Sequence, residues 1–501
     1  MDSIWEVHMR KSGILLHISS LPSPYGIGSF GKAAYDFVDQ LKEAGQGYWQ
    51  VLPMGPIGFG DSPYQSFSAF AGNPYFIDLD TLIDEGLLTK KECDAVDFGN
   101  DPKKVDYAKM YEERIPLLKK AYKRAYVYKD LDFQDFVEDN AKWLWDYSMF
   151  MALKDYFNGS AYTEWPEDIQ KRFAYSLDYY REKLYFEIEF YQFLQYKFFT
   201  QWKKLKDYAN AQGIKIIGDL PFYVAADSAD TWSHPELFQL DEEGVPTAVA
   251  GCPPDKEMKE GQIWGNPLYN WEKHRQKGYR WWTRRMRVSF VLYDAVRLDH
   301  FRAFDEYYSI PYMSENAVNG HWEKGPGMDL IGHLRDEFGD KELIAENLGI
   351  EGESAKALLR ESGCAATKVL QYAFQDGGEI YLPYNYTKNS VVYTGTHDDE
   401  PLHAWAQGLT KKVRAEICKY FNIDDVDDDS LVNAMICGAM SSVSNVCIIP
   451  VQDYLNYGAG YRMNVPSTVG DNWTFRLKPG KMTKKIWKQI AELTKTYGRF
   501  Q

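Results

Sequence analysis

Short apolar runs rich in β-branched residues recur along the chain, and each ends in a polar residue, a glycine or a proline. Such runs are typical of the buried strands of a parallel sheet. Eight of them are found, at residues 13–18, 48–54, 214–221, 295–301, 342–349, 368–374, 391–398 and 445–453. Eight parallel strands are the number that closes a (β/α)8 barrel.

Several gaps between these runs carry the 3.6-residue period of amphipathic helices, as in residues 31–45, 329–339 and 354–363. Strand and helix therefore alternate as in βαβ units, which predicts an α/β protein built on a TIM-type (β/α)8 barrel. The barrel is expected to be irregular between the sixth and seventh strands, because residues 375–390 are polar, contain glycine and show no helical pattern.

Two long insertions interrupt the alternation. Residues 80–212, after the second strand, carry aromatic and charged residues at helical spacing, which predicts a helical subdomain. Residues 223–270, after the third strand, are rich in Gly, Pro, Asp and Trp, which predicts a loop-rich insertion on the side where barrels place their active sites. No repeat or flexible linker separates these segments, so residues 1–501 are expected to form a single barrel that carries both insertions.

Charge and composition limit the classes of molecule that the protein is expected to bind. The 57 Lys and Arg against 72 Asp and Glu give a net charge of −15, which argues against binding to nucleic acid or anionic lipid and favours a neutral partner. Aromatic residues make up 16% of the chain; most are expected to fill the core, although their flat faces also suit sugar rings.

Location and cofactors are also constrained. The N-terminal residues lack the pattern of a signal peptide, and no apolar run reaches the length of a membrane span. The six cysteines are scattered without the spacing of a zinc site, which indicates reduced thiols. We therefore expect a cytoplasmic protein with no cofactor, no metal and no membrane partner.

Acidic residues stand at the ends of five predicted strands: Asp219, Asp299, Glu346, Asp398 and Asp453. These ends meet at one face of a barrel, which is where active sites lie. Any one of the acids alone is as readily explained as a helix cap or a loop carboxylate. Together with the interleaved Arg297, His300 and His397, they form a ring that can keep some acids ionised and one protonated, as glycosyl transfer requires.

A divalent metal is the alternative occupant of such a cluster. Arg297 stands two residues before Asp299 on the same strand face, where it supplies the positive charge that a metal would otherwise provide. Arg297 is also expected to lower the pKa of Asp299. The sequence therefore favours two carboxylates at close range, the arrangement of a retaining glycosyl-transfer site.

Three motifs carry a family resemblance: RLDHFRAF at 297–304, AENLG at 345–349 and TGTHDD at 394–399. They resemble the catalytic motifs of the amylomaltases, the 4-alpha-glucanotransferases or disproportionating enzymes of the alpha-amylase superfamily. Further segments agree along nearly the whole chain, at residues 13–31, 49–74, 218–232, 261–271 and 462–468. The resemblance implies transfer of alpha-1,4-glucan segments between maltooligosaccharides, amylose or glycogen-derived glucans, as a part of starch and glycogen metabolism.

The resemblance also implies roles for the strand-end residues. Asp299 is implied to be the nucleophile, Glu346 the general acid and base, and Asp398 the carboxylate that stabilises the transition state. Arg297 is implied to orient Asp299, and Asp219 to support the site from the end of the third strand.

Five further residues are implied to bind sugar. His300 and His397 resemble the histidines that hydrogen-bond the sugar bound just before the cleaved bond, and Tyr64 resembles the aromatic platform beneath that sugar. Trp264 is a candidate sugar contact. Asn464 is a weaker candidate, whose alternative role is to set a turn.

The sequence departs from the family at three places. Asn347 stands where the family commonly has Asp, and Asp399 where it commonly has Asn. Residues 256–260, KEMKE, replace the usual aromatic pair after CPPD, which puts control of acceptor entry in doubt.

Two alternatives to transfer stay open at this level: a retaining alpha-glucan hydrolase, if water reaches the intermediate first, and a non-catalytic glucan-binding protein. The three carboxylates argue against the second alternative. The sequence does not set the oligomeric state.

Overall fold

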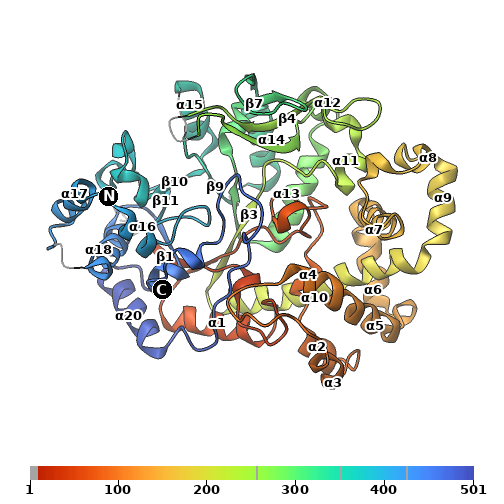
Figure 1. Ribbon diagram of the computed structural model, residues 1–501, viewed down its shortest axis with the longest axis horizontal. Coiled ribbons are helices and arrows are strands. Elements are labelled where there is room, and N and C mark those ends of the chain that lie inside the picture. The colour runs from red at the N-terminus through yellow and green to blue at the C-terminus, as the bar shows by residue number, and fades with distance from the viewer. Residues whose placement is uncertain (1–9, 256–257, 340, 350–351, 425–426) are drawn as a thin grey trace, which may run out of the picture.

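Eight parallel strands close into a barrel at the centre of the computed structural model, which describes residues 10–255, 258–339, 341–349, 352–424 and 427–501 (Figure 1). The strands are β1 (Lys11–Leu15), β2 (Tyr48–Gln50), β3 (Lys215–Leu220), β6 (Ala295–Leu298), β9 (Glu342–Ala345), β10 (Ala365–Val369), β11 (Ser390–Tyr393) and β12 (Val446–Pro450). Their order around the barrel is β1-β12-β11-β10-β9-β6-β3-β2, with β2 hydrogen-bonded back to β1. The predicted (β/α)8 barrel is confirmed, and each strand falls in or next to a predicted run.

The sixth strand lies earlier than predicted. The run at 368–374 was expected to be the strand, but β10 begins at Ala365, and Leu370–Phe374 is a 3-10 helix. An apolar run of this length does not distinguish a strand from a tight helical turn, which explains the shift. After that 3-10 helix, the described chain before β11 forms the short 3-10 turns Gly378–Tyr381 and Pro383–Asn385, in the segment where no helix was predicted.

Helices cover the outside of the barrel, and the three predicted ones are α1 (Lys32–Glu43), α14 (Gly327–Phe338) and α15 (Glu353–Ser362). The others that follow β3 are α11 (Ala229–Ser233), α12 (Trp271–Gln276), α13 (Arg280–Leu292), α16 (Leu402–Gly408), α17 (Lys411–Phe421), α18 (Asp428–Ser441), α19 (Val451–Tyr454) and α20 (Lys484–Thr496). Helix α1 shows the common pattern: it buries Ala34, Phe37, Val38 and Leu41 on one face.

A helical segment separates β2 from β3. Its helices are α2 (Leu79–Asp84), α3 (Lys90–Asp94), α4 (Tyr107–Lys109), α5 (Ile115–Ala125), α6 (Leu131–Asp139), α7 (Ala141–Tyr156), α8 (Glu167–Gln170), α9 (Ala174–Lys183) and α10 (Tyr185–Ala211). Helices α5 to α9 extend away from the barrel (Figure 1). Helix α10 returns to it: the Trp202 indole donates to the Leu292 carbonyl at 2.9 Å and packs on Phe30. Across the described residues, no helix combines the length and apolar character needed to cross a lipid bilayer.

A second, antiparallel sheet stands beside the barrel. Its strands, in spatial order, are β5 (Gln262–Pro267), β4 (Ala248–Cys252), β7 (Glu306–Pro311) and β8 (His321–Lys324). The segment 223–270 was expected to be loop-rich, yet it supplies two of these strands, and the other two follow β6. The Arg302 guanidinium lies 3.8 Å from the centre of the Trp322 ring, so this sheet also contacts the segment that follows β6.

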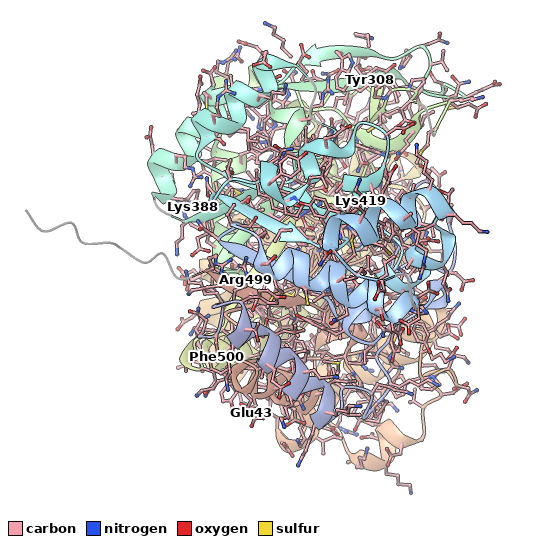
Figure 2. All side chains as sticks on the ribbon, turned by 90° about the vertical axis from the view of Figure 1, so that its left-hand side faces the viewer. Glu43, Tyr308, Lys388, Lys419, Arg499 and Phe500 are labelled. Atoms are coloured by element: carbon pink, nitrogen blue, oxygen red, sulfur yellow. The ribbon has the colours of Figure 1, made fainter. Side chains whose placement is uncertain are left out.

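The C-terminal residues close the barrel at the start of β1. Arg499 is fully buried and donates to four backbone carbonyls, those of Lys11, Met440, Ser442 and Ser444, at 2.8 to 3.1 Å. The Gln501 amide donates to the Gly45 carbonyl at 3.1 Å. Figure 2 shows Arg499 and Phe500 on the side of the molecule where Glu43 lies.

Candidate active site

The predicted acids sit where three neighbouring strands end. Asp219 lies within the end of β3, Asp299 follows β6, and Glu346 follows β9. The ladder continues past the strands, because the Asp299 amide donates to the Leu220 carbonyl at 3.1 Å and the Glu346 amide to the Leu298 carbonyl at 3.0 Å. The backbone of both acids is thereby held at one edge of the barrel.

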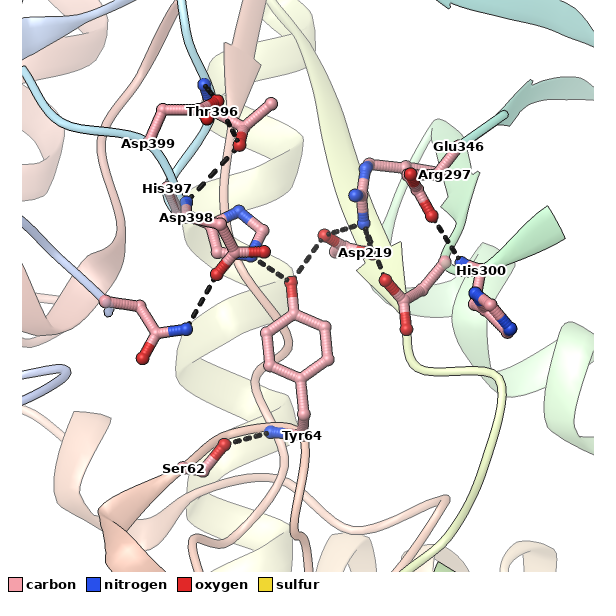
Figure 3. A network of polar contacts seen from close by, with 12 residues as sticks. Ser62, Tyr64, Asp219, Arg297, His300, Glu346, Thr396, His397, Asp398 and Asp399 are labelled. Atoms are coloured by element: carbon pink, nitrogen blue, oxygen red, sulfur yellow. Dashed lines mark hydrogen bonds and ion pairs between the residues drawn. The ribbon is translucent and has the colours of Figure 1, made fainter. Parts of the chain in front are cut away.

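Arg297 joins two of these acids. Its Nη1 donates to both oxygens of Asp219, at 2.9 and 2.8 Å, and to Oδ1 of Asp299 at 3.2 Å (Figure 3). Arg297 and Asp219 are buried, so their pair acts with little screening by water. Asp219 therefore holds Arg297 in place, and Arg297 holds one oxygen of Asp299.

Tyr64 connects this pair to His397, the residue before Asp398 in the chain. Its hydroxyl donates to Asp219 Oδ2 at 2.8 Å and lies 2.9 Å from Nε2 of His397 (Figure 3). The rings of Tyr64 and His397 are stacked, with centroids 5.4 Å apart. Because Tyr64 is tied at its hydroxyl and stacked on its face, it lies in the site as a fixed flat surface.

Asp398 is held by residues from two loops. Its Oδ1 accepts from the Asn464 amide at 2.7 Å, and its backbone amide donates to the Thr396 hydroxyl at 3.3 Å. The guanidinium of Arg462 donates to the Asp398 carbonyl. The Asn464 position, the weakest of the candidates by sequence, thus contacts the acid directly.

Asp399 and Asn347, the two residues next to the acids that differ from the family pattern, form hydrogen bonds that hold the local chain in place. Asp399 Oδ2 accepts from the amide and the hydroxyl of Thr396, at 2.7 and 2.8 Å, and its Oδ1 accepts from the Tyr372 hydroxyl at 2.9 Å. Asn347 accepts from the Thr367 amide at 2.7 Å. Asp399 therefore shapes the turn that carries Asp398, and Asn347 ties the end of β9 to β10.

Glu346 meets only uncharged hydrogen-bond donors. One oxygen accepts from the His300 amide at 2.8 Å and the other from the Leu348 amide at 3.3 Å. Burial raises the pKa of Glu346 to about 8; Arg297 opposes the shift, and the negative charge of Asp299 adds to it. Glu346 therefore keeps its proton at neutral pH.

Asp299 is the more acidic of the two. Burial raises its pKa to about 6, although the adjacent Arg297 lowers it. Arg297 was expected to lower this pKa and does so, but the loss of water around the carboxylate outweighs its effect. The two carboxyl groups are thus separated into an ionised Asp299 and a protonated Glu346.

His300 has a free ring nitrogen facing an aromatic wall. Burial lowers its pKa to about 4, so the imidazole is neutral, and its buried Nε2 has no hydrogen-bond partner. Trp264 packs edge-on against the ring at 4.9 Å, and Tyr223 lies 6.4 Å away. A buried polar atom without a partner is costly, which indicates a place for a ligand hydroxyl.

Other residues of the region were not predicted. Tyr223, Thr396 and Arg462 lie in loops, where no periodicity marks them; the available signal was that each lies inside a segment that carries the family resemblance. Asp453, the fifth strand-end acid, has both carboxylate oxygens engaged in hydrogen bonds to its own surroundings. Its oxygens accept from the Thr394 hydroxyl and the Leu402 amide, at 2.6 and 2.7 Å, so it caps α16.

The divergent KEMKE segment is only partly described, because residues 256–257 lie outside the described residues. The Glu260 carbonyl accepts from the Ala317 amide at 2.9 Å, which joins this segment to the loop between β7 and β8. Within the described ranges, no group of three or more His, Cys, Asp or Glu side chains is arranged to hold a metal ion.

Known proteins match over nearly the whole chain. A family model described as 4-alpha-glucanotransferase matches residues 16–483. A 4-alpha-glucanotransferase of Streptococcus pneumoniae is 46% identical over 494 residues, which cover 98% of this chain and 97% of that protein. One of Thermus thermophilus is 44% identical over 484 residues, or 95% and 96% of the two chains. The structure of an amylomaltase from Streptococcus agalactiae in complex with acarbose superposes with a TM-score of 0.95 at 40% identity and covers 98% of this chain and 100% of that one.

Proposed function

Since this chain belongs to the 4-alpha-glucanotransferase family, it transfers alpha-1,4-glucan segments, and we propose that Asp299, Glu346 and Asp398 carry out the transfer. The observation that supports these roles is the difference between two carboxyl environments. Asp299 accepts from the Arg297 guanidinium, whereas Glu346 accepts only from backbone amides. An ionised nucleophile and a protonated acid are what a retaining double displacement needs at its start.

The first displacement forms a covalent intermediate. A carboxylate oxygen of Asp299 attacks the anomeric carbon of the donor sugar, and the bond from that carbon to the glycosidic oxygen breaks. Glu346 gives its proton to the departing oxygen, which leaves as the 4-hydroxyl of the released fragment. Asp398, held by Asn464, faces the positive charge that develops on the sugar ring.

The second displacement passes the segment to an acceptor. Glu346, now ionised, takes the proton from the 4-hydroxyl of an incoming glucan. That oxygen attacks the anomeric carbon, and the ester bond to Asp299 breaks. Two inversions retain the alpha configuration, and both carboxyl groups return to their starting protonation states.

Sugar binding falls to the side chains around the acids. Tyr64 offers its fixed ring face, and the unpartnered Nε2 of His300 is suited to a sugar hydroxyl. His397 stacks on Tyr64 and Trp264 packs edge-on against His300, while Arg297 and Asp219 support the nucleophile. The acarbose bound to the Streptococcus agalactiae amylomaltase supports an oligosaccharide ligand here.

The substrates we propose are neutral maltooligosaccharides, amylose and glycogen-derived glucans, in keeping with the net charge of −15. We place the enzyme in the cytoplasm, where thiols stay reduced, because the buried Cys93, Cys364 and Cys447 form no disulfide. Residues 1–501 are proposed to work as one catalytic body, with 80–212 and 223–270 as its insertions.

Incubation with maltotriose tests the activity. Purified protein is expected to convert maltotriose into glucose and a ladder of longer oligomers, resolved by chain length. Glucose and maltose without longer products would instead indicate a hydrolase, and an unchanged substrate would indicate a glucan-binding protein.

The Asp299→Asn variant tests the nucleophile. Its turnover of maltotriose is expected to fall by at least about a thousandfold, because an amide does not form the glycosyl ester. The variant should keep the circular dichroism spectrum and unfolding temperature of the parent protein. Transfer at the parental rate by a folded Asp299→Asn protein would refute the assignment.

A further inference from the structure

Exposed aromatic side chains are concentrated in one part of the surface. Ten of them lie within residues 111–186, whereas the rest of the described chain exposes four. The ten are Tyr111, Tyr126, Tyr128, Trp145, Tyr156, Phe173, Tyr175, Tyr179, Tyr185 and Phe186. Large aromatic rings are costly to leave in water, so such a concentration indicates a binding surface.

Four of these rings lie on or next to α9 and are here called the α9 strip: Phe173 just before the helix, Tyr175 and Tyr179 on it, and Tyr156 at the end of α7. Their exposed fractions are 43%, 65%, 55% and 41%, respectively. Phe173 and Tyr175 touch, with ring centroids 5.9 Å apart. Tyr175 and Tyr179 are four residues apart, so they lie on one helix face, about 6 Å from each other along the axis.

Lys183 holds two of the rings in place. Its ammonium donates to the Tyr156 hydroxyl at 2.7 Å and to the Tyr179 hydroxyl at 3.1 Å, which joins the end of α7 to α9. The buried Tyr180 lies beneath both, 5.7 Å from Tyr156 and 5.1 Å from Tyr179. Tyr156 and Tyr179 are therefore held in place before any ligand arrives, which reduces the entropy lost on binding.

The chemistry of the strip suits a neutral, ring-shaped ligand. Its members are all aromatic, with no exposed aliphatic side chain among them, and their hydroxyls add polar edges. The nearby Arg181 is paired with Asp178 at 2.7 Å, and the Lys183 ammonium is engaged by two tyrosine hydroxyls. Flat faces bordered by hydroxyls match the C–H face of a glucose unit and the hydroxyl groups around it.

We propose that the α9 strip is a second carbohydrate-binding site, which holds a distant part of a long alpha-1,4-glucan while another part reacts at the barrel. This inference rests on the proposed function, because that function makes a glucan the chain's ligand. Figure 1 shows α9 at the end of the molecule opposite α17, well outside the barrel. Only a polymer occupies both places at once, so a short maltooligosaccharide gains nothing from the strip.

The test compares Tyr175→Ala/Tyr179→Ala with the parent protein. In the Asp299→Asn background, which prevents consumption of the polymer, migration through gels containing amylose measures binding without turnover. The double variant is expected to bind amylose at least threefold more weakly. With Asp299 intact, its rate on maltotriose should stay within a factor of two of the parent, while its rate on amylose falls.

Tyr384→Ala is the matched control, because Tyr384 is 69% exposed and neighbours Tyr420 of α17, on the far side of the molecule. It should bind amylose like the parent. Equal amylose binding by the double variant would overturn the proposal, and so would a parent dimer, seen by light scattering, that the double variant loses. Failure of the parent to act on maltotriose would count against the proposed function alone, since the gel measurement needs no turnover.

Discussion

At the scale of single residues, the two central carboxyl groups differ in the hydrogen-bond donors that contact them. Asp299 has a guanidinium at 3.2 Å, whereas Glu346 has two backbone amides and, among the described residues, no cation within hydrogen-bond distance. Both are buried, which raises both pKa values, but the cation holds that of Asp299 lower. One acid is thus ionised while the other keeps its proton, as the roles proposed for them require.

This difference predicts a bell-shaped pH dependence of kcat/KM for maltotriose. As the pH rises through about 6, Asp299 loses its proton and becomes nucleophilic, so the rate increases. As the pH rises through about 8, Glu346 loses the proton that the leaving group needs, so the rate falls. The two apparent pKa values of this profile describe Asp299 and Glu346 together, because the two carboxyl groups interact.

Initial rates between pH 4.5 and 10 provide the measurement, with the unfolding temperature recorded at each pH as a control. A rate that stays level up to pH 10 in a folded protein would show that Glu346 is not the acid.

At this scale the sequence predicted the acids well and their surroundings poorly. Asp219, Asp299 and Glu346 were recognised because strand ends place them, and strand ends are visible as the limits of apolar runs. Tyr223 and Arg462 depend on how loops fold back over the barrel, and loop geometry leaves no period in the sequence. For the same reason, the sequence did not reveal that Asp453 accepts a hydrogen bond from the first residue of α16.

At the scale of elements, β3 packs tightly against the residues that precede β6. A Cβ atom on Gly218 would lie 2.1 Å from the ring of Tyr293, which is inside that side chain. The next residue of β3 is Asp219, the partner of Arg297. The fit between β3 and Tyr293 therefore helps to position the site.

Gly218→Ala is expected to destabilise the protein by about 1–3 kcal/mol through overpacking, and to lower kcat as Asp219 shifts. Thermal unfolding and maltotriose rates measure the two effects. Gly332→Ala in α14 is the control, because its Cβ would meet only Met328 at 4.0 Å, and it should not destabilise.

The cause is tested by a double-mutant cycle. Gly218→Ala combined with Tyr293→Ala should be less destabilising than the sum of the two single changes, since the second removes the clash. Strict additivity would show that the ring of Tyr293 is not what Gly218 accommodates.

Helices and strands were easier to predict when the sequence pattern that defines them lies within the element itself. The amphipathic pattern placed α1, α14 and α15, because a helix makes its hydrogen bonds within itself. The sheet of β4, β5, β7 and β8 was missed. Its strands β4 and β7 pair although β6 lies between them in the chain, and neither segment reveals its partner in the sequence. The shift of β10 has a similar origin, because its residues also suit a 3-10 turn.

The whole molecule is held closed by its last residues. Arg499 is a buried cation whose guanidinium is satisfied by four backbone carbonyls from the strand starts and the end of α18. These hydrogen bonds link the start of β1 to the residues just before β12, the first and last strands of the barrel in the sequence.

Arg499→Met should lower the free energy of unfolding by about 3 kcal/mol, because it leaves buried carbonyls without donors. The change lies far from the acids, so kcat for maltotriose should stay unchanged at temperatures where the variant is folded. Urea or thermal unfolding measures the loss. Lys488→Met on the exposed face of α20 is the comparison, expected to cost less than about 1 kcal/mol. An equal effect of both changes would mean that the carbonyl contacts add nothing to stability.

The pairing of β1 with β12 has a consequence for how the protein is made. A ribosome releases β1 long before β12, and at usual rates of synthesis the interval is roughly 20–90 s. Throughout that time β1 has an open edge able to pair with strands of other nascent chains. The yield of active enzyme in a cell should therefore depend on how well that edge is shielded until the final strand emerges.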